Sequence, residues 1–194
     1  MSLPLPESPR YLHRISPMPS APGGSTSIAL YSAVETPLGK LLIVGDAEGL
    51  RHIVLANRAE SLRVDWHFAP SAFPEAIHQL QAYFAGRLKV FDLPLAPQGT
   101  PFQQKVWKAL QAIPYGQTIC YAELAQAVGK PGAARAVGAA NRCNPLPIVI
   151  PCHRVIGKDG RLTGYRGGLE LKQKLLQLEQ SASDLVFGRL ERLS

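Results

Sequence analysis

A cysteine followed directly by a histidine is the part of this sequence best suited to chemistry. Cys152 and His153 lie within residues 151–155, after the apolar residues 147–150. The thiolate is the nucleophile, and a cysteine with an ordinary pKa of about 8.5 is only slightly ionised at neutral pH. His153 and Arg154 are neighbours that could supply the ionised form. The segment predicts a nucleophilic cysteine, although a small buried residue at a strand end is the plainer interpretation.

Glycine is unusually frequent at residues 164–168, which read Gly-Tyr-Arg-Gly-Gly. Such a segment is unfavourable inside a helix, where each glycine costs about 1 kcal/mol relative to alanine. We interpret it as a loop that lies over a flat ligand, with Tyr165 as an aromatic wall. The other interpretation is a glycine-marked helix end followed by a turn.

The formal net charge of +7 comes entirely from the second half of the chain. Residues 1–99 contain eight Lys or Arg and eight Asp or Glu, whereas residues 100–194 contain thirteen and six. A basic domain suits a polyanion, and nucleic acid is the obvious candidate. Many basic domains bind nothing and merely stay in solution, so charge alone leaves both interpretations open.

Length and cysteine content limit the class of protein. With 194 residues, 46% of them apolar, the chain has room for one large or two small domains. The cysteines Cys120, Cys143 and Cys152 are odd in number, and no secretory segment opens the sequence. We therefore expect free thiols and a cytoplasmic setting rather than a disulfide framework. No window approaches the ~18 consecutive apolar residues of a membrane span, so no membrane partner is expected.

The elements that position these residues fall into two groups, and we expect the first over residues 28–92. Alternating apolar residues predict three antiparallel strands, at residues 28–34, 40–44 and 50–55. A helix is expected to begin at Pro74 and to stop at Gly86. Six prolines and a Gly-Gly pair predict a disordered tail over residues 1–27, and residues 93–99 predict a linker.

The second group, residues 100–180, is expected to be mainly helical. Thr100 as N-cap and Pro101 in the first turn predict the start of a helix. The apolar stripe of this helix consists of Phe102, Val106, Leu110 and Ile113. A break at residues 114–116 follows, after which we expect Thr118 to cap a second helix.

A third helix, made almost entirely of small residues, is expected at residues 133–141 after a glycine-bearing turn at residues 129–132. Helix, short turn and small-residue helix are typical of a helix-turn-helix, whose second helix enters a groove of DNA. Arg135 is the only long side chain inside this helix. It is either a solvated surface residue or, on its alanine-glycine face in the basic half, a contact to nucleic acid.

Several ordered blocks over about residues 28–180 resemble the O6-alkylguanine-DNA alkyltransferases, also called methylated-DNA–protein-cysteine methyltransferases. The blocks are FQQKVW (102–107), IPYG (113–116), YAELA (121–125), AARAVG (133–138), NPLPI (144–148), IPCHRV (150–155) and GYRGGL (164–169). The resemblance implies an α+β protein. Its N-terminal domain would be a small antiparallel sheet with a helix, ribonuclease H-like, and its C-terminal domain mostly α with a helix-turn-helix of the winged-helix type.

The same resemblance implies roles for three residues at the reacting centre. Cys152 corresponds to the residue that takes an alkyl group onto its sulfur in one irreversible transfer. His153 corresponds to the base that acts on the thiol through a water, and Glu179 to the carboxylate that orients this histidine. A carboxylate behind an imidazole stabilises the imidazolium that forms when the thiol proton leaves. From its position alone, Glu179 would be a solvated helix residue.

The alkyl carbon sits on a base inside duplex DNA, so attack by sulfur requires the nucleotide to rotate out of the stack. Arg135 corresponds to the finger that fills the vacated space. Tyr121 corresponds to the residue that turns the phosphate and protonates the leaving guanine, although it could equally be a core aromatic. Asn144 corresponds to the tie between recognition helix and active-site loop, which an Asn-Pro turn would explain as well. The residues implied to bind DNA are Tyr121, Ala134, Arg135, Gly138 and Arg142.

The residues implied to line the substrate pocket are Pro147, Val155, Tyr165 and Arg166. The carbonyls of Cys152 and Val155 would accept from the guanine amino group, and the amide of Arg166 would donate to the guanine oxygen. In many relatives a small residue stands at position 166. The bulky cation of Arg166 therefore either narrows the pocket or adds a phosphate contact.

The resemblance implies no cofactor and no metal. Residues 1–99 contain no cysteine, so the cysteine-rich zinc site of some relatives cannot be built there. The expected partner is double-stranded DNA that contains alkylated guanine, with O4-alkylthymine left open. We expect a monomer, associated with the nucleoid in a bacterium. Cys143 stands where small residues are common and is either filler or a second oxidisable thiol; residues 181–194 form an extension outside the resemblance.

Three functions remain in view at this point. The leading one is stoichiometric transfer of an alkyl group from O6 of guanine to Cys152. The second is a non-repairing binder of alkylated DNA, as cysteine-lacking relatives are, and the presence of Cys152 argues against it. The third is a cysteine hydrolase for small esters or peptides, which would need an oxyanion hole and turnover.

Overall fold

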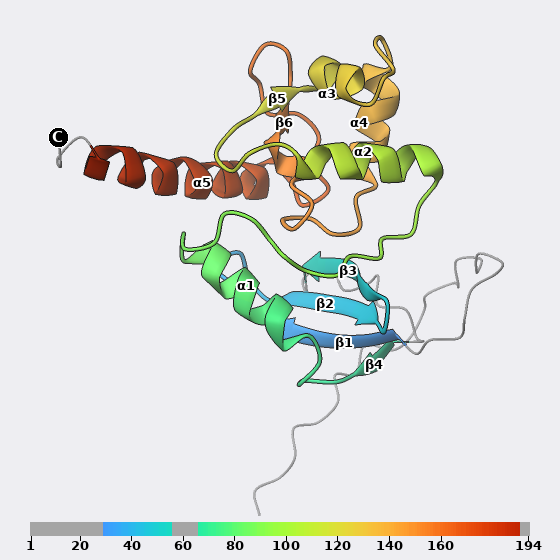
Figure 1. Cartoon of the computed structure of the whole chain (residues 1–194), viewed down its shortest axis with the longest axis vertical. Coiled ribbons are helices and arrows are strands. Elements are labelled where there is room, and N and C mark those ends of the chain that lie inside the picture. The colour runs from blue at the N-terminus through green and yellow to red at the C-terminus, as the bar shows by residue number, and fades with distance from the viewer. Residues whose placement is uncertain (1–28, 56–65, 191–194) are drawn as a thin grey trace, which may run out of the picture.

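The chain folds into a sheet-and-helix part and a helical part that pack together (Figure 1). The computed structural model describes residues 29–55 and 66–190, with the side chains of the last helix described as far as Ser181. The tail expected at residues 1–27 lies outside the described residues. The architecture is α+β, as expected from the sequence.

The N-terminal part is a four-stranded sheet in the order β3-β2-β1-β4. Its strands are β1 (Ala29–Val34), β2 (Leu41–Asp46), β3 (Gly49–Leu55) and β4 (Trp66–Phe68). The β1–β2 and β2–β3 pairs are antiparallel, which confirms the three expected strands. The short strand β4 was not expected, and it pairs parallel to β1, so the sheet is mixed.

Helix α1 (Pro74–Phe84) packs on this sheet and supplies much of its core (Figure 1). Proline at the first position suits a helix start, because its missing N–H would have no intrahelical partner there. The helix ends two residues before Gly86, the expected stop, and Gly86 itself has a φ of 69°. Leu80 and Tyr83 on its inner face are fully buried.

Helix α2 (Pro101–Gln111) opens the C-terminal part as the sequence predicts. Thr100 caps it, and the side chain of Gln103 closes a capping box by accepting from the backbone N–H of Thr100. Trp107 is buried and donates from Nε1 to the carbonyl of Ala140 at 2.9 Å, which fixes α2 against the helix that carries Ala140.

The helix-turn-helix consists of α3 (Tyr121–Ala127) and α4 (Ala134–Arg142). The expectation that Thr118 caps the first of these helices is wrong. The N-cap is Cys120, whose backbone N–H donates to Glu123 at 2.6 Å. The cap moves because residues 119–120 form a strand, β5 (Ile119–Cys120), that pairs parallel with β6 (Val155–Ile156).

The chain closes with α5 (Leu169–Leu190), which continues past residue 180, where the sequence resemblance ends. Buried apolar side chains from the sheet, from α1 and from the helical part form one continuous cluster. The two parts therefore share a core. None of the helices in the described ranges is both long and apolar enough to cross a membrane.

Candidate active site and nucleic-acid interface

The loop that leads to Cys152 is held by the side chain of Asn144. Its Oδ1 accepts from the backbone N–H of Leu146 at 3.0 Å, and its Nδ2 donates to the carbonyl of Ile150 at 2.8 Å. Residues 147–150 do not form the strand suggested by their apolar run. They make a turn in which Ile148 takes a φ of 77°, which is rare for a β-branched residue and costs of the order of 1–3 kcal/mol. Asn144 stabilises this turn from both ends.

Cys152 opens a three-residue 3-10 helix, η2 (Cys152–Arg154), that runs directly into β6. Because β6 pairs with β5, and β5 leads into α3, the cysteine is tied to the start of the helix-turn-helix. Asn141 on α4 adds a longer contact by donating to the carbonyl of Cys152 at 3.4 Å. Cys152 is only 5% exposed, so a reactant must come into the protein to reach it.

His153 and Glu179 meet as the sequence resemblance implies. His153 Nε2 lies 2.9 Å from Oε1 of Glu179, and both side chains are fully buried. Nδ1 of His153 has no hydrogen-bond partner among the described residues. One imidazole nitrogen is therefore engaged by the carboxylate, and the other can act on a thiol or a bridging water.

Arg154 has a different place from the one suggested by its position beside the cysteine. Its guanidinium pairs with Glu179, from Nε at 2.9 Å and from Nη2 at 2.8 Å, and it also donates from Nη1 to the carbonyl of Ile113. The expectation that Arg154 arms the thiol directly is wrong. It neutralises the buried carboxylate instead, since an isolated charge is costly there.

Glu179 accepts further hydrogen bonds from two other parts of the chain. The hydroxyl of Tyr83, from α1, donates to Oε1 at 2.8 Å, and the backbone N–H of Gly116 donates to Oε2 at 2.9 Å. Burial by itself would raise the pKa of Glu179, but the hydrogen bonds and charges of His153 and Arg154 outweigh it and lower the pKa to about 2. The carboxylate is thus ionised at neutral pH.

The thiol of Cys152 and the imidazole of His153 both rest in their neutral forms at neutral pH. Burial raises the pKa of Cys152 above its ordinary value, against smaller lowering effects from Asn144, Lys172 and Tyr165. Burial also lowers the pKa of His153, and it outweighs the raising effect of Glu179. A neutral imidazole beside a protonated thiol can accept the thiol proton when a reactant arrives.

Two polar residues near the cysteine were not found from the sequence, Lys172 and Asn141. Lys172 is fully buried, and its ammonium donates to the carbonyls of Val155 and Thr163. Burial lowers the pKa of Lys172 to about 8. The resemblance implies that the carbonyls of Cys152 and Val155 accept from the guanine amino group. Asn141 already donates to the first of these carbonyls, and Lys172 to the second. A lysine in an amphipathic helix gives no sequence signal of this kind, because most such lysines are solvated.

The glycine-rich segment at residues 164–168 is a loop, which favours the first of its two interpretations. The hydroxyl of Tyr165 is buried beside the thiol of Cys152 and makes no hydrogen bond of ordinary geometry among the described residues. Burial, and then the thiol, raise the pKa of Tyr165. A side chain at Gly167 would lie 2.8 Å from the ring of Tyr165 and would collide with Leu171. A side chain at 167 would therefore force Leu171 and the ring of Tyr165 to shift. Arg166 is exposed.

Four of the five residues expected to contact DNA line one shallow hollow of about 350 Å³ on the helix-turn-helix. The hollow is lined by Tyr121, Ala134, Arg135, Gly138 and Thr163. Arg135 is exposed at its edge, and Gly138 leaves the ring of Tyr121 open, since a Cβ there would lie 3.6 Å from that ring. The fifth residue, Arg142, is exposed at the far end of α4 and does not line the hollow.

The structure also shows where Pro147, Val155 and Cys143 lie. Pro147 is half-buried and Val155 fully buried beside the cysteine segment. Cys143 is exposed at the end of α4, as a free thiol. Within the described ranges, no group of three or more His, Cys, Asp or Glu side chains could hold a metal ion.

A buried cysteine–histidine–glutamate arrangement, set beneath a helix-turn-helix and beside a small sheet, defines the class of protein. Residues 29–97 match the ribonuclease-like domain, and residues 101–181 the DNA-binding domain, of 6-O-methylguanine DNA methyltransferase. The chain belongs to this family.

Similar proteins agree with this assignment. The methylated-DNA–protein-cysteine methyltransferase of Methanosarcina barkeri is 51% identical over 153 residues, which are 78% of this chain and 97% of the relative. The protein of that name from Mycobacterium tuberculosis is 51% identical over 152 residues, 78% of this chain and 92% of the relative.

Two solved structures extend the comparison to three dimensions. The crystal structure of Mycobacterium tuberculosis OGT in complex with DNA matches with a TM-score of 0.75 and 49% identity, covering 79% of this chain and 94% of that one. The O6-methylguanine-DNA methyltransferase of Pyrococcus kodakaraensis matches with a TM-score of 0.58 and 26% identity, covering 78% and 98%.

Proposed function

We propose that this protein repairs DNA by moving an alkyl group from O6 of guanine onto the sulfur of its own Cys152. The bond from the alkyl carbon to O6 breaks, and a carbon–sulfur bond forms. The thiol proton passes to His153. Guanine, the leaving group, stays in the DNA and becomes neutral by gaining a proton. The buried Cys152–His153–Glu179 arrangement beneath a helix-turn-helix is the observation that carries this proposal.

His153 is proposed as the base, acting through its unpartnered Nδ1 and a bridging water. The resting thiol is protonated, so the chain does not spend its nucleophile on small electrophiles in solution. When the proton leaves, the imidazolium is stabilised by Glu179, which is already ionised. No further step follows, because a thioether is stable in water at neutral pH.

The low exposure of Cys152 supports a reaction in which the target base leaves the duplex. A base stacked in DNA presents no free path to a buried sulfur, and extrusion costs a few kcal/mol. Arg135 is proposed to fill the vacated stack, and Tyr121 to turn the phosphate and protonate the leaving guanine. Both line the hollow on the helix-turn-helix face.

We assign the DNA contacts and the transfer to residues 100–180 and a supporting role to residues 28–92. Ala134, Gly138 and Arg142 are proposed to approach the DNA backbone along α4. Pro147, Val155, Tyr165 and Arg166 are proposed to surround the extruded guanine. The substrate places the protein wherever the cell keeps its DNA, which is the cytoplasm in a bacterium.

Intact-mass spectrometry after incubation with a duplex that contains O6-methylguanine tests the proposed function. The protein mass should rise by one methyl group, the modified peptide should contain Cys152, and at most one guanine should be restored per protein. Unmodified duplex of the same sequence is the control. Restored guanine in excess of the protein would contradict a single transfer and favour a hydrolase.

Cys152→Ser separates transfer from binding. The hydroxyl is a far weaker nucleophile at neutral pH, so transfer should fall below detection while duplex affinity stays within about twofold. Full transfer by this variant would exclude Cys152 as the acceptor. If the wild-type protein binds the alkylated duplex and leaves it unchanged, the chain is a non-repairing binder.

A further inference from the structure

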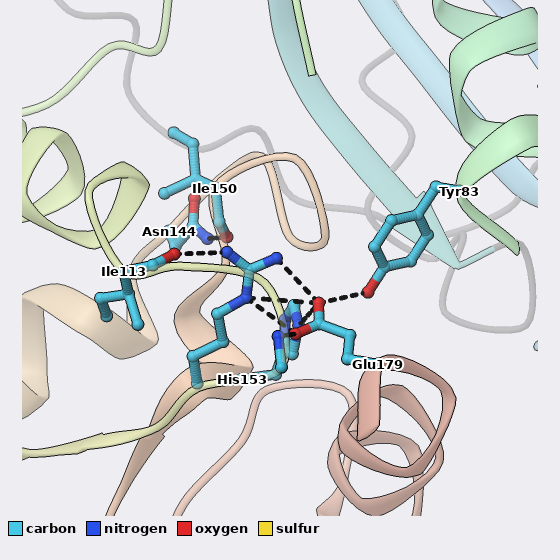
Figure 2. A network of polar contacts seen from close by, with 8 residues as sticks. Tyr83, Ile113, Asn144, Ile150, His153 and Glu179 are labelled. Atoms are coloured by element: carbon cyan, nitrogen blue, oxygen red, sulfur yellow. Dashed lines mark hydrogen bonds and ion pairs between the residues drawn. The ribbon is translucent and has the colours of Figure 1, made fainter. Parts of the chain in front are cut away.

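One residue from the sheet part of the molecule enters the acid–base arrangement. Tyr83 lies in α1, 96 positions before Glu179 in the chain, and its hydroxyl donates to Oε1 of Glu179 at 2.8 Å. The same oxygen lies 2.9 Å from Nε2 of His153. Figure 2 shows Tyr83 and His153 approaching the carboxylate from different directions. Tyr83 and the candidate base therefore share one acceptor atom.

The surroundings of Tyr83 make its hydroxyl a permanent donor. The side chain is fully buried, and its ring packs against Phe84, Phe91 and Tyr115, with centroids 5.3, 5.3 and 5.9 Å away. Burial and then the negative charge of Glu179 raise the pKa of Tyr83 far above its ordinary value, so it stays protonated. The ring contacts explain why an aromatic residue stands here, but they would serve a phenylalanine equally well.

The hydroxyl bears on how strongly Glu179 attracts a proton on His153. The charged or titratable groups that act on His153 are Glu179, which favours imidazolium, and Arg154 and Lys172, which oppose it. A hydrogen bond donated to a carboxylate oxygen draws charge toward the donor, and a charge-assisted bond of this kind is stronger than a neutral one. Tyr83 therefore reduces the negative charge on Oε1 that favours the imidazolium form of His153. Its effect has the same direction as that of Arg154.

We propose that Tyr83 is a positioning residue for the transfer reaction: by donating to Glu179 it limits the negative charge that faces His153 and keeps the imidazole free to accept the thiol proton. The inference rests on the proposed function, because it concerns the base of that reaction. It gives the sheet part of the molecule a chemical role beyond supporting the fold.

Tyr83→Phe tests the inference, because it removes the hydroxyl and keeps the ring. Without this donor, Glu179 should hold a proton on His153 more tightly, so the pKa of His153 should rise. The acid limb of single-turnover transfer rate against pH should move up by about half a pH unit, which is a roughly threefold slower reaction on the acid side. Duplex affinity, measured in the Cys152→Ser background, should not change.

Tyr115→Phe is the matched control. The hydroxyl of Tyr115 is buried in the same aromatic cluster and has no hydrogen-bond partner among the described residues, so its loss should leave the acid limb in place. An unchanged acid limb in Tyr83→Phe would overturn the inference, whatever happened to melting temperature or plateau rate. So would an equal displacement in both variants.

A second readout needs no transfer at all. The ring ¹⁵N shifts of His153, followed by NMR across the pH range in the unreacted protein, report its protonation directly. A higher titration midpoint in Tyr83→Phe than in wild type and Tyr115→Phe supports the inference, and equal midpoints overturn it. If wild-type protein transferred no alkyl group, the proposed function would fail, while this measurement would still decide whether Tyr83 controls the protonation of His153.

Discussion

At the scale of single residues, Glu179 is a buried charge that is stable only because of its donors. Tyr83, Gly116, His153 and Arg154 all donate to it, from segments far apart in the chain. A buried carboxylate without such partners would take up a proton instead. Glu179 therefore links the stability of the protein to its candidate chemistry.

The low pKa of Glu179 predicts a loss of stability in acid. Its pKa is about 2 in the folded chain, against an ordinary value of 4.5, so the stabilisation is fully present above about pH 4.5 and is lost as the pH falls toward 2. It amounts to the order of 3 kcal/mol. Denaturant unfolding between pH 6 and pH 3 should therefore show a steep decline in the free energy of unfolding.

Glu179→Gln should make that decline shallower, because an amide does not titrate. The variant should also be less stable at neutral pH, by about 3–5 kcal/mol, since Arg154 keeps its charge without a partner. Glu170→Gln is the matched control, an exposed carboxylate on the same helix. Parallel pH profiles for wild type and Glu179→Gln would contradict the assignment of the low pKa to Glu179.

The residue scale also shows what sequence reasoning could and could not reach. Cys152 and His153 were found from a short motif, whereas the contact between His153 and Glu179 was predicted from the family resemblance alone. The hydrogen bonds from Tyr83 to Glu179 and from Lys172 to the carbonyl of Val155 were missed. Both donors are residue types that are ordinary for a helix, and only the folded arrangement brings them to the site.

At the scale of elements, α4 presents an exposed arginine beside a surface of small residues. Arg135 stands at the edge of the hollow that Tyr121 and Gly138 also line. Small side chains let the helix approach a DNA backbone closely, and one long side chain can then reach into the stack. This arrangement predicts that Arg135 matters only when a base must be extruded.

Arg135→Ala should slow transfer from duplex DNA by at least about tenfold, or about 1.4 kcal/mol in the barrier. Transfer from free O6-benzylguanine should stay within about twofold, because a free base needs no extrusion. Lys174→Ala is the control, an exposed cation on α5 that pairs with Glu170. Equal losses on both substrates would exclude the proposed role of Arg135 in extrusion.

Elements were predicted with mixed success, and each error has a physical cause. The N-cap at Thr100 was found because the signal, a threonine followed by a proline, is local in sequence. The cap at Thr118 was wrong because residues 119–120 belong to β5, which pairs with β6 more than thirty positions away. The strand suggested at residues 147–150 is a turn, because Asn144 offers its backbone a local hydrogen-bond partner. Pairing across long separations cannot be read from a hydrophobic pattern.

At the scale of the whole molecule, the excess of positive charge lies in the part that carries the helix-turn-helix. Cations that neutralise phosphates release condensed counterions, so duplex affinity depends steeply on salt. Arg142 is exposed at the end of α4, outside the hollow, where a phosphate contact fits better than a base contact.

Affinity for undamaged duplex should therefore fall linearly with salt on logarithmic axes. Arg142→Ala should make the slope shallower by about 1, the expected effect of losing one phosphate contact. Lys40→Ala, an exposed lysine between β1 and β2, should leave the slope unchanged. Fluorescence anisotropy across a salt series measures the slope for each protein. Identical slopes for wild type and Arg142→Ala would exclude a phosphate contact by Arg142.

Glu179 is synthesised after the partners that donate to it. A ribosome produces Tyr83 first, then Cys152 and His153, and completes the arrangement only when it reaches Glu179 in α5. Until then the nascent chain has a thiol and an imidazole but no carboxylate to hold a proton on the imidazole. A chain cut short before α5 would lack Glu179, the partner of His153 Nε2. Reactivity thus comes last in synthesis, which spares an acceptor that can be used only once.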